Sequence, residues 1–156
     1  MRGRARSVRK SGSASGSGSD GAWYRSWVFQ RDYILRMFEA VALVAARVLK
    51  LLVQQKKPEE AQQVVAEGYR TLSLDREFLL VLDGPSIRTH CGGDDEKLQL
   101  AAKLLLLDCE VQVHKAERRE ALRTLKAARR VLGELREKPE ELSNDLERLA
   151  QVVAAM

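Results

Sequence analysis

The sequence predicts an all-α protein, built as a stack of antiparallel helical hairpins with a disordered N-terminal tail. Three observations predict this fold class. After residue 30 the composition is dominated by Leu, Ala, Glu, Lys and Arg, which favour helices over strands. In the same region, apolar residues recur every three or four positions. Only a few residues separate most of the expected helices, and short connections favour antiparallel neighbours.

The start of the chain differs in composition from the rest. It is rich in Arg, Ser and Gly, and residues 11–21 (SGSASGSGSDG) form a low-complexity linker. Residues 1–29 carry six basic side chains against the single acid Asp20, which accounts for the whole formal charge of +5. The remainder is therefore neutral. We expect a disordered basic tail at residues 1–27 and a single α-helical domain at residues 28–156.

The first helix is expected from Gln30 to Lys56. One row of apolar residues marks its core-facing side: Ile34, Met37, Val41, Val44, Val48 and Leu52. A second row lies beside the first: Leu35, Ala42, Leu49 and Val53. A helix that is apolar on two sides usually packs between two neighbours, and we expect the same here.

The second helix is expected from Pro58 to about Leu74. Proline suits the first helical position, and the two acids that follow it suit the positive end of the helix dipole. A short helix at residues 76–82 should follow, capped by Asp75. Residues 83–95 (DGPSIRTHCGGDD) contain Gly-Pro and Gly-Gly pairs, which predict the one long loop inside the domain.

Three further helices complete the domain. The first, from Glu96 to about Lys115, contains four consecutive leucines and should therefore lie at the centre. The next, at about residues 117–136, has a narrower apolar stripe. The last opens with Pro139 and runs to the end of the chain.

Two of the expected helices have similar sequences. Residues 60–72 read EAQQVVAEGYRTL and residues 120–132 read EALRTLKAARRVL. Each contains a small, an apolar and a small residue at spacings of four and three: Ala61, Val65 and Gly68, then Ala121, Leu125 and Ala128. This pattern resembles the second helix of a tetratricopeptide repeat. The resemblance implies paired helices in close contact and a stack that offers a groove to partner segments.

The stretch FQRDYILRMFE, at residues 29–39, resembles the opening of a small, uncharacterised family of bacterial helical proteins, in which similar residues stand near the initiator. Because the bacterial start codon GTG encodes valine, we expect translation to begin at Val28. The alternatives are a genuine basic tail and an added linker. The family has no known activity, so the resemblance implies no site residue.

Side chains suited to metal binding or nucleophilic catalysis are few: His90, Cys91, Cys109 and His114. Structural zinc sites use pairs of ligands at short spacings such as Cys-x-x-Cys, whereas His90 and Cys91 are adjacent in the sequence. The other two lie five apart, on different sides of a helix. No group orients His90 and Cys91 as base and nucleophile. We therefore expect no metal, no cofactor and no enzymatic activity.

Asp108 stands within the most apolar helix, between Leu107 and Cys109. A buried carboxylate is costly unless it is paired. We therefore expect an arginine from a neighbouring helix to satisfy it, and a ligand contact is the alternative.

The helix at residues 117–136 continues a basic stripe with spacings of four, four, three and four: Lys115, Arg119, Arg123, Lys126 and Arg130. Such a face binds phosphates, an acidic partner or a membrane surface, or is an ordinary solvated surface. Because the domain is neutral and no aromatic residue lies among these arginines, we do not expect physiological affinity for nucleic acid.

The last helix carries its own apolar stripe: Leu142, Leu146, Leu149, Val153 and Met156. A terminal helix of a stack usually has a polar outer face, yet no polar side chain follows Gln151. We expect this stripe either to fill a groove of the same chain or to join two copies in a weak homodimer.

These observations favour a non-enzymatic module for protein–protein interaction. The alternative is binding of nucleic acid or an acidic partner through the basic stripe. No uninterrupted run of about 18 apolar residues occurs, so we expect no membrane span. Two cysteines fit a reducing compartment, and we expect a cytoplasmic location.

Overall fold

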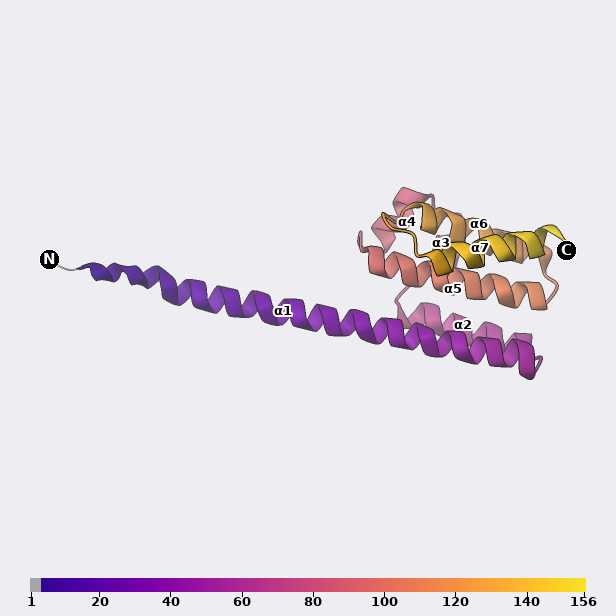
Figure 1. Cartoon of the computed structure of the whole chain (residues 1–156), viewed down its shortest axis with the longest axis horizontal. Helices are drawn as coiled ribbons and strands as arrows, with labels where there is room; N and C mark the ends of the chain where they lie inside the picture. The colour runs from indigo at the N-terminus through magenta and orange to yellow at the C-terminus, as the bar shows by residue number, and fades with distance from the viewer. Residues whose placement is uncertain (1–3) are drawn as a thin grey trace. The chain divides into compact units, whose positions relative to one another are not determined.

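The computed structural model describes the backbone of residues 4–156 and the side chains of residues 21–156 except Tyr24. In this part of the chain all regular structure is helical, which confirms the predicted fold class. Figure 1 shows the order of the elements: α1 (Arg4–Leu49), the π-helical segment η1 (Lys50–Gln54), α2 (Pro58–Thr71), α3 (Arg76–Val81), α4 (Gly84–His90), α5 (Asp95–His114), α6 (Arg118–Gly133) and α7 (Glu140–Ala154).

The chain divides into two compact units, Met1–Arg36 and Met37–Met156. The second unit contains the later part of α1 and every other element. The disordered tail expected at residues 1–27 falls largely outside the described side chains. Translation from Val28 likewise stays a prediction.

Helix α1 differs from the expected first helix at both ends. It begins well before Gln30, because extending an existing helix costs little per residue. It ends at Leu49, and η1 then widens the last turn. The chain reverses at Lys56, where the Lys57 amide donates to the Leu51 carbonyl at 2.8 Å. Three residues in such turns have left-handed backbones without being glycine: Lys56, Ser73 and Ala116.

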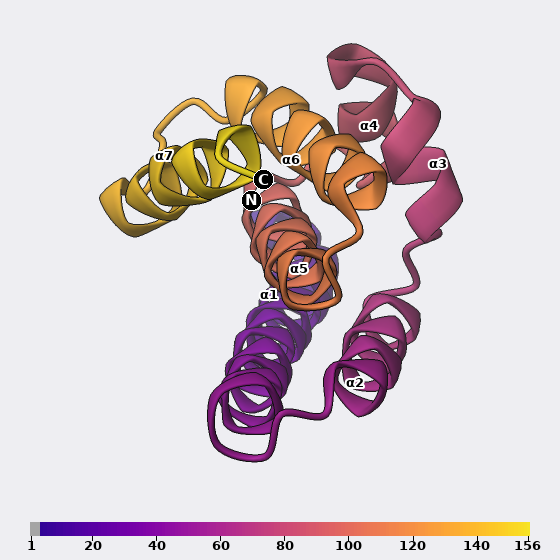
Figure 2. The ribbon, with the colours of Figure 1, turned by 90° about the vertical axis from the view of Figure 1, so that its right-hand side faces the viewer.

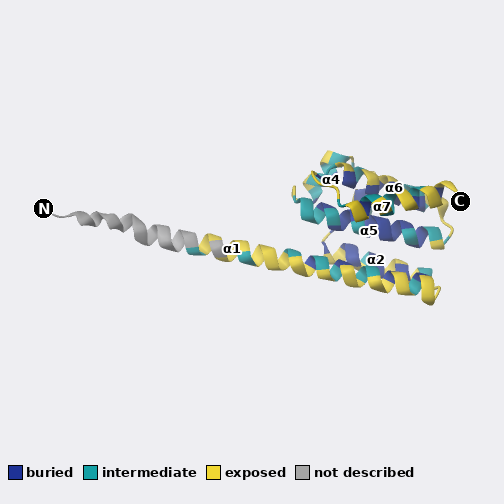
Figure 3. Cartoon of the chain, in the orientation of Figure 1, coloured by how far each residue is buried: buried dark blue, intermediate teal, exposed yellow. Residues whose placement is uncertain are grey.

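Helix α5 lies at the centre of the second unit, as its four leucines predict. Viewed along the helices in Figure 2, α2 packs on one side of α5, and α6 and α7 pack on the other. Every residue from Leu104 to Cys109 is buried, which Figure 3 shows as the dark blue of α5. Apolar groups on all sides of one helix therefore require a cover of several helices.

The small residues of the repeated pattern lie at close contacts with α5. Ala121 and Ala128 are fully buried, and the Cys109 Sγ lies 3.4 Å from the Ala121 carbonyl oxygen. In α2, a Cβ atom added at Gly68 would lie only 2.8 Å from Leu104 Cδ2. Small residues thus lie where α5 approaches both α6 and α2.

The prediction of a long loop at residues 83–95 is wrong, because α4 occupies more than half of it. The Asp83 carboxylate accepts a hydrogen bond from the Ser86 amide at 2.8 Å, and Pro85 stands in the first turn. These are ordinary features of a helix start. Ile87 is fully buried, and Arg88 donates to the Glu134 carbonyl at 2.6 Å, so both hold α4 in place.

The second apolar row of α1 is also placed differently from our expectation. All four of its members are exposed: Leu35, Ala42, Leu49 and Val53. Periodicity correctly identified two apolar sides of this helix. Because α1 is the first helix of the stack, only one of these sides has helices packed against it among the described elements. Within the described chain, no further helix covers this second row, and two of its members, Ala42 and Leu49, border cavities beside α5.

Gly68→Ala should destabilise the protein by about 1 kcal/mol, because a buried methyl group forces Leu104 to move. Thermal or urea unfolding of the full chain measures this change. Gly133→Ala is the matched control, since nothing lies within 4 Å of its added Cβ. It should be neutral or stabilise by up to about 1 kcal/mol. Equal effects of the two substitutions would contradict close α2–α5 packing.

Candidate functional site

A groove runs along α5 between α1 and α7. Its first cavity, of about 270 Å³, is lined by Phe38, Val41, Ala42, Gln99, Leu100, Lys103, Pro139, Glu141 and Leu142. Its second, of about 240 Å³, is lined by Leu49, Lys103, Leu106, Leu107, Glu110, Glu141, Asp145, Arg148 and Leu149. The two cavities share Lys103 and Glu141 and therefore adjoin. We call them together the α5 groove.

The first cavity of the α5 groove is mainly apolar. Its walls come from Phe38 and Val41 of α1, Leu100 of α5 and Leu142 of α7. At about 270 Å³ it lies just below the range of roughly 300–1,000 Å³ that is typical of small-molecule pockets. Its size and lining suit a large apolar side chain of a partner better than a polar cofactor.

Charged side chains join α5 to α7 along this groove. Lys103 Nζ lies 3.6 Å from a Glu141 oxygen and 3.8 Å from an Asp145 oxygen. Arg148 donates to Glu110 at 2.7 Å, and this hydrogen bond raises the pKa of the Arg148 guanidinium. The Glu141 side chain stays 80% exposed, so its carboxylate remains accessible beside the apolar cavity.

Asp108 is buried on the other side of α5, where it accepts three hydrogen bonds. Tyr69 of α2 donates from its hydroxyl at 2.9 Å, and Arg76 of α3 donates from Nε at 2.6 Å. Gln112 donates to the second oxygen at 3.1 Å. The expected arginine partner of Asp108 is thus confirmed, and it comes from the short helix α3.

This network extends to the surface and perturbs several titrating groups. Burial, and then the charge of Asp108, raises the pKa of the Tyr69 phenol well above its usual value. Burial disfavours the charged form of Arg76, but its hydrogen bond to Asp108 more than compensates and raises the guanidinium pKa. Arg76 also contacts Glu120 of α6 at 3.2 Å. The network therefore holds α2, α3 and α6 around α5, and its polar groups are used internally.

The structure does not leave the basic stripe as one free surface. Lys115 donates to Gln62 at 2.5 Å, Arg123 to Glu120 at 2.8 Å, and Arg130 to the Leu80 carbonyl at 2.8 Å. In the described part of the chain, only Arg119 and Lys126 of the five are exposed without a partner. Binding of nucleic acid or an acidic partner through this stripe stays a prediction.

The stripe of α7 packs inside its own chain. Leu142, Leu149 and Val153 are buried, and α7 contacts both α5 and α6. Leu146 is partly buried, and Met156 is exposed. We expected the stripe either to pack in a groove of its own chain or to join two copies, and its buried members pack within their own chain. They can join a second copy only if α7 leaves the core.

The histidines and cysteines have separate surroundings. The His90 ring meets Phe78 edge-on at 5.8 Å between centroids, and His114 Nδ1 lies 3.0 Å from the Glu110 carbonyl oxygen. Cys91 and Cys109 are buried, unpaired thiols. Among the described residues, no three His, Cys, Asp or Glu side chains are grouped to hold a metal ion.

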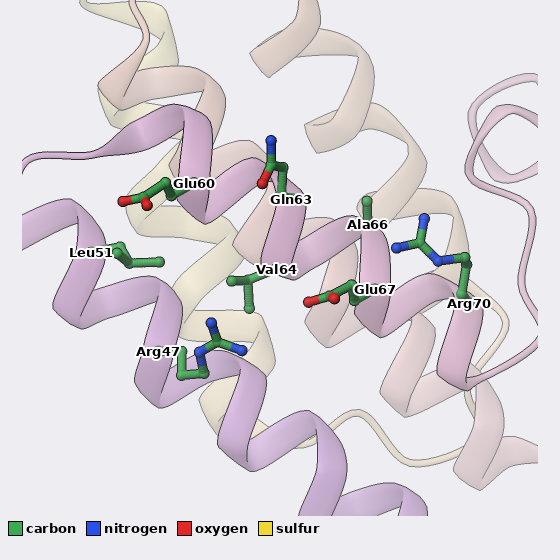
Figure 4. Close-up of a pocket in the computed structure, with 8 residues that line it drawn as sticks. All are labelled: Arg47, Leu51, Glu60, Gln63, Val64, Ala66, Glu67 and Arg70. Atoms are coloured by element: carbon green, nitrogen blue, oxygen red, sulfur yellow. The ribbon is translucent and has the colours of Figure 1, made fainter.

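A further depression lies between α1 and α2 and is drawn in Figure 4. Arg47, Arg70, Glu60 and Glu67 border it, together with Leu51, Gln63, Val64 and Ala66. The two arginines are matched by the two glutamates, so the net charge favours neither an anion nor a cation. We therefore assign it no ligand.

Comparison with known proteins does not extend this picture. No protein-family model, curated protein or solved structure matches the chain significantly. Both the tetratricopeptide resemblance and the bacterial-family resemblance stay predictions. None of the described helices combines the length and apolar composition that a membrane span needs.

Sequence reasoning missed the α5 groove. Its residues come from three helices that are far apart in the sequence, and Lys103, Glu141 and Asp145 look like ordinary surface charges. The resemblance to tetratricopeptide repeats implied a groove but named none of its residues.

Arg76→Met should destabilise the protein by about 3 kcal/mol, because it leaves the Asp108 carboxylate without its cation. In an Asp108→Asn background the same change should cost only about 1 kcal/mol, since no buried charge is then left unpaired. Urea unfolding of the four chains measures this coupling. Arg118→Met is the control at an exposed arginine. Additive effects would contradict the ion pair.

Both cysteines should resist alkylation in the folded protein. Burial raises the pKa of the Cys109 thiol to about 11 and also raises that of Cys91, so little thiolate exists at neutral pH. Mass spectrometry after maleimide treatment should find no label on the native chain and a label on both cysteines in denaturant. Rapid labelling of Cys109 in the native chain would contradict its placement.

Proposed function

We propose that this chain is a non-enzymatic helical interaction module that binds a protein partner in the α5 groove. The observation that carries the proposal is the apolar first cavity, which opens beside accessible charge. Phe38, Leu100 and Leu142 offer apolar contact, while Glu141 stands exposed at the edge. Partner grooves of this kind bind amphipathic segments through a few apolar anchors.

The chemistry of the groove specifies the partner further. Three acids and two bases line the second cavity, an excess of one negative charge: Glu110, Glu141 and Asp145 against Lys103 and Arg148. A basic residue on the partner would therefore be favoured next to the apolar anchor. We propose a short amphipathic helix with one large apolar side chain and a neighbouring Lys or Arg.

The proposed setting is the cytoplasm. Two buried cysteines without a disulfide are compatible with a reducing compartment. The absence of activity is likewise part of this proposal, and it is supported by the internal use of the buried Asp108.

Display of randomised helical peptides against the full chain tests the proposed groove. Selected peptides should carry a large apolar residue and a nearby basic residue. Gln99→Trp should weaken them by about tenfold or more, because the indole fills the first cavity, which Gln99 lines. Fluorescence anisotropy with a labelled peptide measures the affinity.

Gln151→Trp is the matched control, since it adds the same side chain at an exposed position of α7 that does not line the groove. It should leave the affinity unchanged. Peptides that bind both variants equally would show that the groove is not the binding site. Selection of peptides without an apolar anchor would contradict the proposed partner chemistry.

A further inference from the structure

The two cavities of the α5 groove follow one another along α5, which lies between α1 and α7 in Figure 2. Leu100 of α5 and Leu142 of α7 line the first cavity. Leu107 and Leu149, on the same two helices, line the second. On each helix the two leucines are seven residues apart, which is two turns, or about 10 Å along the axis. The groove therefore offers two apolar sites that are two helical turns apart.

Charged side chains separate these two apolar sites. Lys103 of α5 and Glu141 of α7 line both cavities, and Asp145, one turn after Glu141, lines the second. Lys103 and Asp145 stand three residues after Leu100 and Leu142, respectively. Two carboxylates thus share one ammonium group between the apolar sites.

Lys103 holds these two carboxylates loosely. Its Nζ atom lies 3.6 Å from a Glu141 oxygen and 3.8 Å from an Asp145 oxygen, and both distances exceed that of a hydrogen bond. Arg148 differs, because it donates to Glu110 at 2.7 Å and reaches Asp145 only at 3.8 Å. Of these two cations, Lys103 is therefore the more easily replaced, since a flexible stem carries it and no hydrogen bond fixes it.

We propose that Lys103 occupies the cation subsite of the α5 groove in the free protein, and that a basic residue of the partner takes its place between Glu141 and Asp145. This inference rests on the proposed function of the groove and names the residue that limits its affinity for a base. In the free protein the Lys103 ammonium group partly neutralises the two carboxylates. In the complex the partner's base contacts them, and Lys103 turns toward solvent on its four-carbon stem.

The same geometry specifies the register of the partner. A helix that lies along α5 rises by the same distance per residue, about 1.5 Å. Apolar side chains at its positions i and i+7 therefore reach the two apolar sites, and a base at i+3 or i+4 reaches Glu141 and Asp145 between them. This pattern is the same in both chain directions, so either orientation of the helix fits. The partner is thus an amphipathic helix with its base between two apolar anchors.

Designed peptides test this register by fluorescence anisotropy with the full chain. The probe is a labelled helical peptide of Ala and Gln that carries Leu at i and i+7 and Arg at i+4. Moving the Arg to i+2 turns it away from the groove and should weaken binding by about fivefold, as should its replacement by Gln. Unchanged affinity in both cases would overturn the register and leave apolar binding in the groove intact.

Lys103→Met should bind the Arg peptide about fivefold more tightly than the parent, because the competing ammonium group is removed. Lys126→Met is the matched control, since it removes the same charge at an exposed position of α6 outside the groove, and it should leave the affinity almost unchanged. Lys103→Arg keeps the cation and should not tighten binding. Circular dichroism confirms that each variant remains helical.

Glu141→Gln should weaken the Arg peptide by about fivefold and leave the Gln peptide unchanged. Because the Glu141 side chain is 80% exposed, this substitution tests the subsite even if Lys103→Met lowers the stability. Glu147→Gln is the matched control, since it removes the same charge from an exposed position of α7 outside the groove.

Two kinds of failure can be told apart. Equal affinity of the parent and Lys103→Met for the Arg peptide, or equal tightening by Lys126→Met, would overturn the role of Lys103 while the groove still binds. Failure of every peptide to bind the parent, or binding that Gln99→Trp leaves unchanged, would overturn the proposed function of the groove and this inference with it.

Discussion

The complete burial of α5 is the constraint on which the rest of the fold depends. Leu104–Leu107 place apolar groups on every side of this helix, and a single hairpin partner cannot cover them all. Helices α2, α6 and α7 therefore surround it, and small residues such as Gly68 and Ala121 bring two of them close. The α5 groove lies where α1 and α7 flank α5 without closing over it.

Among the residues that the structure describes, Asp108 is the one charged group that is buried in this apolar centre, and its partners determine how the short helices are attached. Because Arg76 must reach Asp108, α3 is held against α5 and also against Glu120 of α6. Arg130 and Arg88 complete the attachment through main-chain carbonyls of α3 and of the turn after α6. The insertion between the two hairpins is thus held by arginines as well as by the buried apolar side chains Leu79, Leu80 and Ile87.

Periodicity and residue size predicted most of the fold, because both act locally along one helix. They identified the central helix, the close contact at Ala121, and the need of Asp108 for an arginine. They missed α4, since Asp83-Gly-Pro suits both a turn and a helix start. They also misplaced the second apolar row of α1, because a pattern shows which sides are apolar but not what covers them. The α5 groove combines three distant helices, so only the tertiary structure defines it.

The left-handed residues Lys56, Ser73 and Ala116 have a consequence for how this sequence can evolve. Each terminates a helix through backbone hydrogen bonds typical of a left-handed cap, such as Leu74 N to Tyr69 O at 2.9 Å and Glu117 N to Gln112 O at 2.9 Å. Glycine is the usual residue there, and a residue with a Cβ costs roughly 1 kcal/mol more. All three residues are exposed, and none of them lines the α5 groove. A substitution by glycine at any of these positions should therefore raise the stability of the fold without changing a residue that the proposed function uses.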